Sequence, residues 1–268
     1  MHCPACQHEN PSGQKFCGEC GAQLTSAPAA PLVPGTAPPT LSTPSERFAS
    51  PAAYTPKHLA EKILTSKGAL EGERKQVTVM FTDVTGFTAL SERLDPEEVH
   101  ALMDRAFEVI LNAVHLYEGT INQFLGDGVM ALFGAPIAHE DHASRALSAA
   151  LTINRELQPL GEEVKRLHGR DFLMRIGINT GLVVVGAIGR DLRMDYTAVG
   201  DTTNLAARLL NLAKPGQIVV SRYTQHLRDG FFVFEDLGEF EVKGKTHPVR
   251  AYALTGESRG RKIGRAHV

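Results

Sequence analysis

The chain has 268 residues, of which 43% are hydrophobic, so it can form one full-sized domain with a core and a small appendage. Its 28 lysines and arginines nearly balance its 30 aspartates and glutamates, and the formal charge of -2 excludes a general attraction to nucleic acid or anionic lipid. The sequence contains no apolar run of about 18 residues, and its first residues lack the basic and apolar regions of a signal peptide. We therefore expect a cytoplasmic protein with neither a membrane nor a nucleic acid as its partner.

All four cysteines, Cys3, Cys6, Cys17 and Cys20, form two Cys-x-x-Cys pairs near the N-terminus. A segment of this length buries too little apolar surface to fold alone, whereas zinc can contribute on the order of 10 kcal/mol of folding free energy. Four thiolates leave no open coordination position. We therefore predict a zinc ribbon at residues 1–24 that binds one structural Zn2+ and offers a surface to a protein partner. The alternative is a flexible tail with reactive thiols.

Residues 25–56 contain most of the prolines, separated by alanine, serine and threonine, and this composition predicts a disordered linker. Leu59 and Ile63 are spaced as on a helix, so residues 57–74 are expected to hold a short docking helix and a connector. That helix could pack on the following domain or pair with its twin in a dimer.

The hydrophobic pattern alternates between strands and helices from residue 75 to 255, and the basic tail at residues 256–268 is expected to be disordered. The pattern predicts a strand at 76–84, a hairpin at 120–133, two strands within 172–187, and further strands at 194–199, 217–220, 231–235, 240–242 and 250–254. Helices are predicted at 96–118, 141–168 and 202–213. This order is typical of an α+β domain in which helices pack against an antiparallel sheet.

Asp83 ends the first predicted strand, and the chain turns through Gly86 into a helix that begins near Phe87. A carboxylate at such a corner can hold Mg2+ while the backbone N–H groups of Gly86, Phe87 and Thr88 face the phosphates of a nucleoside triphosphate. The alternative is that Asp83 only caps the helix.

A second carboxylate, Asp127, lies between Gly126 and Gly128 in the predicted hairpin turn. Asp-Gly is the preferred sequence of a tight hairpin, so Asp127 could be a turn residue and nothing more. If the hairpin lies beside the first strand, however, Asp83 and Asp127 meet, and two carboxylates can share two Mg2+ ions that activate a hydroxyl and stabilise a pyrophosphate leaving group. Burying the pair without cations would be costly.

Asn204 and Arg208 lie four residues apart on the helix predicted at 202–213 and therefore share one face. Arg208 can donate to phosphoryl oxygens, and Asn204 can orient the ribose or its oxygen. Such residues on an amphipathic helix also occur as an ordinary solvated face, which is the alternative here.

The three motifs FTDVTGFTAL, QFLGDGVMALFG and DYTAVGDTTNLAARLL, in this order, resemble the class III adenylyl and guanylyl cyclase catalytic domain over nearly all of residues 75–255. The resemblance implies a ferredoxin-like (palm-type) fold with an antiparallel sheet and packed helices. It implies two Mg2+ or Mn2+ ions per active site, held by Asp83, Asp127 and the Val84 carbonyl, with Asn204 and Arg208 as the transition-state pair. Because the family takes these groups from different subunits, it also implies a homodimer with shared sites and an inactive monomer.

By the same resemblance, Arg175 and Lys243 match basic residues that bind the triphosphate, although each alone could be a surface charge at a strand end. The pair that reads the base falls on Gln123, where the family usually has lysine, and on Thr197. The Thr197 hydroxyl can accept from the adenine amino group, whereas the Gln123 amide can serve adenine or guanine. The sequence thus predicts an adenylate cyclase that converts ATP to 3',5'-cyclic AMP and pyrophosphate. The alternatives are a guanylate or mixed cyclase that uses GTP, and a catalytically degenerate regulatory module.

Overall fold

The computed structural model describes residues 54–66, 74–188, 194–197, 202–241 and 247–258, with backbone alone at 66, 88–89, 185–188 and 194–197. The chain divides into two compact units, Met1–Leu41 and Ser42–Val268, and every described residue belongs to the second. The predicted zinc ribbon with its four cysteines, nearly all of the predicted linker, Lys243 and most of the predicted tail therefore lie outside the described residues.

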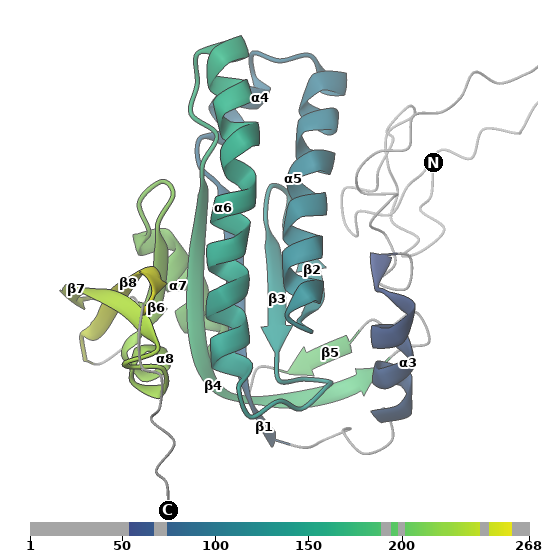
Figure 1. Ribbon diagram of the computed structural model, residues 1–268, viewed down its shortest axis with the longest axis vertical. Coiled ribbons are helices and arrows are strands. Elements are labelled where there is room, and N and C mark those ends of the chain that lie inside the picture. Colours follow the sequence, from purple (N-terminus) through teal and green to yellow (C-terminus); the bar gives the residue numbers. More distant parts are fainter. Residues whose placement is uncertain (1–53, 67–73, 189–193, 198–201, 242–246, 259–268) are drawn as a thin grey trace, which may run out of the picture. The chain divides into compact units, whose positions relative to one another are not determined.

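The described strands form one sheet in the order β2-β3-β1-β4-β6-β8-β7, with β5 paired to β4 (Figure 1). They are β1 (Arg74–Val84), β2 (Thr120–Phe124), β3 (Val129–Phe133), β4 (Met174–Ile188), β5 (Met194–Thr197), β6 (Ile218–Ser221), β7 (Phe232–Phe240) and β8 (Val249–Glu257). Every pair is antiparallel except β4 and β6, which run parallel. The predicted antiparallel sheet is therefore corrected to a mixed sheet, because the chain between β4 and β6 passes through a helix and returns in the same direction.

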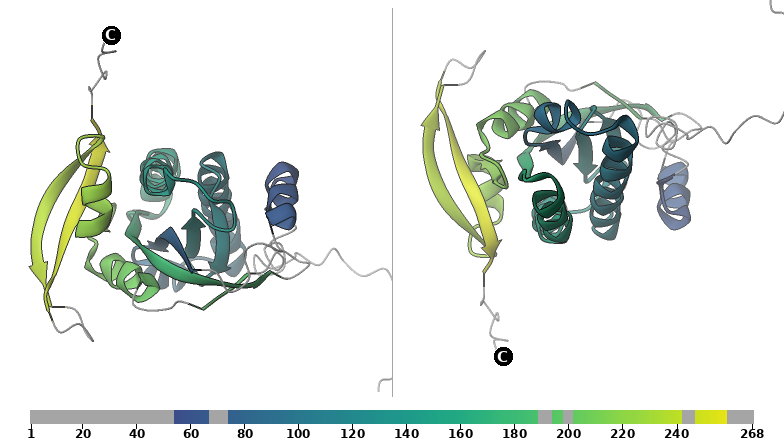
Figure 2. Two further views of the ribbon diagram at one scale, coloured as in Figure 1. Left: turned by 90° about the horizontal axis from the view of Figure 1, so that it is seen from below. Right: turned by 90° about the horizontal axis from the view of Figure 1, so that it is seen from above.

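The central strand β1 is covered on both faces, which explains its unbroken run of buried residues from Val77 to Thr82. Val77, Val79 and Phe81 join a cluster that includes residues of α7 (Thr202–Leu212), whereas Met80 and Val84 join the main core on the other face. α5 (Pro96–Leu116) and α6 (His142–His168) lie side by side across that second face (Figure 2).

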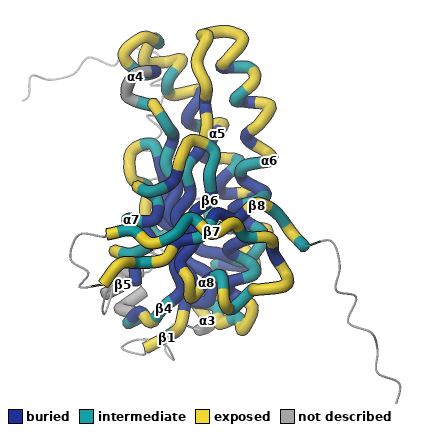
Figure 3. Tube along the Cα trace, turned by 90° about the vertical axis from the view of Figure 1, so that its left-hand side faces the viewer, coloured by how far each residue is buried: buried dark blue, intermediate teal, exposed yellow. Residues whose placement is uncertain are grey.

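The two long helices follow from the spacing of their apolar residues, as the sequence predicted. The buried residues of α5 recur at intervals of three and four, and alanines at the buried positions of α6 let the helix approach the sheet. Burial is concentrated along the inner faces of these two helices and in the sheet that they cover (Figure 3). Within the described ranges, no helix combines the length and the apolarity that a membrane crossing requires.

Two predicted breaks are wrong. The residues from 172 to 187 were expected to form two strands, but β4 is continuous because residues 179–181 pair with residues 77–79 of β1. The strands expected at 231–235 and 240–242 are likewise one strand, β7, which accommodates Gly238, at a φ of 87°, in a bulge opposite β8. Two short helices complete the domain, α4 (Phe87–Ser91) and α8 (Arg222–Leu227), of which α8 was not predicted.

The predicted docking helix is present as α3 (Lys57–Ser66), and it packs on the domain of its own chain. Lys62 donates to the Glu118 carboxylate at 2.5 Å, just beyond the end of α5. The Tyr54 ring, which precedes the helix, lies edge-on to Phe124 of β2 with centroids 5.4 Å apart. The sequence left open whether this helix packs on its own domain or pairs with its twin in a dimer. The contacts in the structure are with its own domain.

A close approach between α7 and β4 gives a test of this fold. A Cβ on Gly177 would lie 2.3 Å from the Leu210 nitrogen and 2.4 Å from the Ala206 carbonyl oxygen, both in the backbone of α7. Gly177→Ala should therefore push α7 off the sheet and lower the free energy of unfolding in urea by about 2 kcal/mol or more. Gly256→Ala is the matched control, because a Cβ there meets nothing within 4 Å. Equal stability of the two variants would contradict this packing.

Candidate active site

The hairpin between β2 and β3 lies against the end of β1 without room for a side chain at residue 128. A Cβ on Gly128 would lie 1.9 Å from the Thr82 carbonyl oxygen. The Thr82 hydroxyl, buried in β1, accepts a hydrogen bond of 3.0 Å from the Val129 N–H, and the Leu125 N–H closes the turn on the Gly128 carbonyl at 2.8 Å. These contacts bring Asp127, at the tip of the hairpin, to the residue that follows Thr82.

Asp83 and Asp127 therefore face each other, as the paired-carboxylate hypothesis requires. The pKa of the Asp127 carboxyl is raised to about 6, first by partial burial and then by the negative charge of Asp83 and a hydrogen bond between the two carboxyl groups. Such a pair is electrostatically unfavourable when both groups are ionised, and a cation between them would relieve the repulsion. By its chemistry and its proximity, the donor set fits the divalent metal ions that the sequence predicted.

In this structure the Asp83 carboxylate forms an ion pair with the Arg175 guanidinium. The two residues are direct partners in the β1–β4 ladder, and the Arg175 Nη2 donates to the Asp83 Oδ2. Their side chains are 27% and 21% exposed, so the ion pair is partly shielded from water. The sequence placed Arg175 among the substrate-binding residues, but it did not predict this contact.

The turn after β1 lies beside the carboxylates. Val84 is buried, and the Thr85 N–H donates to the Leu173 carbonyl at 2.8 Å, which fixes the turn to the start of β4. Gly86 has a φ of 72°, a conformation that favours glycine, and α4 begins at Phe87 and includes the backbone of Thr88. A cavity of about 330 Å³ adjoins Thr85 and Gly86.

The two residues predicted to read the base lie on different strands. Gln123 is an exposed residue of β2 and follows a bulge, since Ile121 pairs with Ala131 while Gln123 pairs with Met130. Thr197 ends β5, where its backbone pairs with Val184 of β4.

Asn204 and Arg208 lie on α7, on the opposite side of the helix from the buried Ala206. Asn204 is exposed and Arg208 is partly exposed. Odd-numbered residues of β1 face α7, so Asp83 points to the same face of the sheet as this helix. The predicted metal and transition-state groups are thus on one face, on separate elements.

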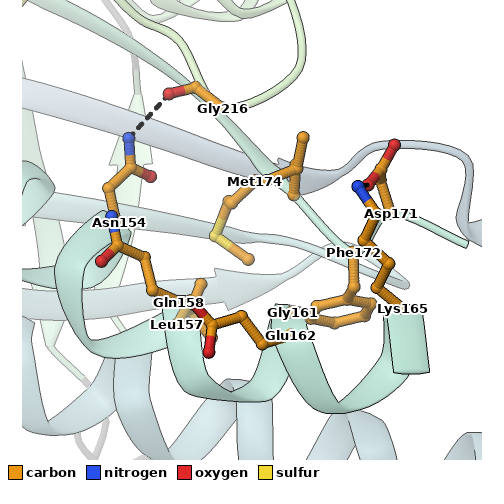
Figure 4. A pocket seen from close by; sticks show the side chains of 11 residues that line it. Asn154, Leu157, Gln158, Gly161, Glu162, Lys165, Asp171, Phe172, Met174 and Gly216 are labelled. Carbon is orange, nitrogen blue, oxygen red and sulfur yellow. Dashed lines mark hydrogen bonds and ion pairs between the residues drawn. The ribbon is translucent and has the colours of Figure 1, made fainter. Parts of the chain in front are cut away.

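A second cavity, of about 420 Å³, lies between α6 and the segment that enters β4 (Figure 4). Its floor is apolar, with Phe172 and Met174, and at its edge Lys165 and Asp171 form an ion pair of 3.0 Å. Asn154 spans the cavity wall with a hydrogen bond of 2.9 Å to the Gly216 carbonyl. None of the residues that the sequence singled out lines this cavity.

Gly128 and Thr82 are the positioning residues that the sequence analysis missed. Gly128 was interpreted only as part of a turn, although its lack of a side chain is what permits the close approach to β1. The available signal was a threonine near the end of a mostly apolar strand, immediately before the aspartate. A buried hydroxyl needs a hydrogen-bond partner, so Thr82 indicated that another backbone segment lies beside this strand.

Two families match the sequence. The Adenylate and Guanylate cyclase catalytic domain matches residues 71–256, and the Double zinc ribbon matches residues 3–38. Adenylate cyclase 1 of Rhizobium meliloti (strain 1021) is 35% identical over 209 residues, which are 76% of this chain and 31% of that protein. The chain spans about three tenths of the length of the curated relatives it matches.

Solved structures of both adenylyl and guanylyl cyclases resemble the fold. The adenylyl cyclase CyaB from P. aeruginosa superposes with a TM-score of 0.65 at 35% identity, over 71% of this chain and 98% of that chain. The guanylyl cyclase Cya2 superposes with a TM-score of 0.64 at 33% identity, over 72% of this chain and 98% of that chain.

The partial burial of Asp127 and its repulsion by Asp83 predict a pH-dependent stability in metal-free protein. Because the folded pKa of Asp127, about 6, exceeds the ordinary value of 3.8, the folded chain retains a proton that the unfolded chain releases, so this group lowers stability as the pH rises from about 4 to about 6. Asp127→Asn removes this cost. In EDTA, its Tm should exceed that of the unsubstituted protein at pH 7 and match it near pH 4. A difference that does not vary with pH would contradict the paired geometry.

Proposed function

We propose that this chain, which belongs to the Adenylate and Guanylate cyclase catalytic domain family, converts ATP to 3',5'-cyclic AMP and pyrophosphate at sites shared between two copies of the chain. The observation that carries the proposal is the meeting of Asp83 and Asp127 beside the turn that leads into α4. Neither a helix cap nor a hairpin turn requires a second carboxylate beside the first.

Asp83, Asp127 and the Val84 carbonyl would hold two Mg2+ or Mn2+ ions. When bound, such ions lower the pKa of the attacking 3'-hydroxyl and offset the charge of the pyrophosphate leaving group. The backbone N–H groups of Gly86, Phe87 and Thr88 lie at the start of α4, and we propose that they bind the phosphates.

Arg175 and Lys243 complete the proposed triphosphate site. A guanidinium presents planar pairs of donors to phosphoryl oxygens, so Arg175 can hold the β- and γ-phosphates next to the ions on Asp83. Lys243 is proposed from the family resemblance, as a compact charge at the same end of the substrate.

We propose Asn204 and Arg208 as the transition-state pair, acting on a substrate held by the Asp83 and Asp127 of the partner. The exposure of Asn204 on the outer side of α7 supports this assignment, because an exposed amide can reach a second subunit. Arg208 would stabilise charge on the transferred phosphorus, and Asn204 would orient the ribose. A single chain would then lack a complete site.

Gln123 and Thr197 are proposed to read the base. The Thr197 hydroxyl can accept from the adenine amino group, and the exposed amide of Gln123 can present a donor and an acceptor to the ring. We favour ATP on this basis. Guanylate or mixed specificity is the second candidate, because the Gln123 amide can rotate to suit guanine and the chain resembles solved enzymes of both kinds.

For the N-terminal unit, we propose one structural Zn2+ held by Cys3, Cys6, Cys17 and Cys20. The match of residues 3–38 to the Double zinc ribbon family supports this, and four cysteines supply the donors for one tetrahedral site. A protein that docks on the ribbon would be its partner.

Subunit complementation tests the shared site. With ATP and Mn2+, Asp127→Asn and Arg208→Ala should each lower cyclic AMP formation by at least about 100-fold. A heterodimer of the two variants, purified through two different tags, contains one intact site and should recover roughly half of the unsubstituted activity. Mass spectrometry of the nucleotide product identifies the reaction. An inactive heterodimer from two folded variants would show that all groups come from one chain, and full turnover by both single variants would exclude this chemistry.

Base choice is tested by Gln123→Lys. If Gln123 faces the base, the fixed charge of lysine should favour adenine, and the ratio of kcat/KM for ATP to that for GTP should rise by at least about tenfold. Gln158→Lys makes the same exchange at an exposed position of α6 and should leave the ratio unchanged. An unchanged ratio in Gln123→Lys, or an equal effect of both variants, would remove Gln123 from the base site.

A further inference from the structure

We propose that Arg175 is an internal counter-ion that occupies Asp83 until a triphosphate draws it away, so that nucleotide and divalent metal favour each other's binding. This inference rests on the proposed function, because it assumes that Asp83 is a metal ligand. It adds a competition between a side chain and the metal that the binding role of Arg175 does not imply.

The ion pair is built into the sheet. Asp83 and Arg175 are opposite each other in a ladder that runs without a register shift from Arg74 paired with Val184 to Val84 paired with Met174. Cross-strand partners in an antiparallel pair project to the same face. Arg175 can therefore leave Asp83 only by changing its rotamer, and without a competing ligand the two charges remain neighbours.

The contact and metal binding at Asp83 compete. The Arg175 Nη2 donates to the Asp83 Oδ2, and only about a quarter of either side chain is exposed, so water does not fully screen the pair. A divalent cation at the Asp83 Oδ2 would have to displace the Arg175 N–H donor. It would also be repelled by the guanidinium charge beside it. Two carboxylates with one guanidinium carry a net charge of -1, whereas the two carboxylates alone would carry -2 and would attract a cation more strongly.

Arg175 also has an unused donor. Its Nε is buried and has no hydrogen-bond partner among the described residues. A guanidinium can donate through five N–H groups, and phosphoryl oxygens accept two at once. A triphosphate at the turn after β1 would offer acceptors for the unpaired Nε. It would therefore compete with Asp83 for the guanidinium.

Displacement by the triphosphate then links the two ligands. A nucleotide that binds Arg175 frees Asp83 for the metal, and a metal on Asp83 releases Arg175 for the phosphates. Because the linkage is thermodynamic, the factor by which nucleotide raises metal affinity must equal the factor by which metal raises nucleotide affinity. Without nucleotide, the proposed site should hold metal weakly.

Calorimetric titration with Mn2+ in the absence of nucleotide tests the competition on the full chain. Arg175→Gln removes the positive charge with little change of shape and should bind Mn2+ at least about fivefold more tightly than the unsubstituted protein. Arg175→Lys keeps a cation beside Asp83 and should stay near the unsubstituted affinity. Circular dichroism and the Tm check that each variant is folded, and Mn2+ affinity that is unchanged or weaker in folded Arg175→Gln overturns the inference.

Two further arms separate the inference from the function on which it rests. A non-reactive ATP analogue should raise Mn2+ affinity in the unsubstituted protein and should lose most of this effect in Arg175→Gln; equal coupling in both proteins overturns the exchange. Asp127→Asn should abolish the Mn2+ heat. If it does not, the metal is not at the carboxylate pair, and the proposed function fails together with the inference. If cyclic AMP forms but Arg175→Gln binds Mn2+ as before, only the inference fails.

Discussion

The β2–β3 hairpin approaches the end of β1 so closely that a methyl group on residue 128 would overlap the Thr82 carbonyl. This approach brings two carboxylates together, which a protein selected for stability alone would avoid. Partial burial, together with the charge of Asp83, raises the pKa of Asp127. The Thr82 hydroxyl supports the approach by accepting a hydrogen bond from the Val129 N–H. The proposed chemistry depends on this compromise.

The β1–β4 ladder supplies the second constraint. Bulges interrupt the β2–β3 and β7–β8 pairs, but the pairing of β1 with β4 is regular over the whole length of β1. A regular register fixes which side chains are neighbours, so Arg175 is held opposite Asp83 by the backbone of both strands. A sheet is a stiff support, so the backbone positions of the two residues stay fixed while the Arg175 side chain can change its rotamer.

The face of the sheet that carries Asp83 also carries α7, whose packing depends on Gly177. The helix buries Ala206 and Leu209 and leaves Asn204 exposed. In the proposed dimer, this division gives α7 two roles, since its inner side completes the core and its outer side serves the partner's substrate. Stability and catalysis would then constrain different residues of the same helix.

Local patterns in the sequence were enough to predict the helices α5, α6 and α7 and the strand β1, because helical periodicity and a buried apolar run each report on their own segment. They failed at residues 179–181 and at Gly238, where turn-forming residues are held in strands by pairing with distant partners. The parallel pairing of β4 with β6, the Arg175–Asp83 ion pair and the need for Gly128 are likewise contacts between segments far apart in the chain. The sequence by itself determined which residues could form a phosphoryl-transfer site, whereas only the tertiary structure decided which of them meet, because register and close approach depend on both partners at once.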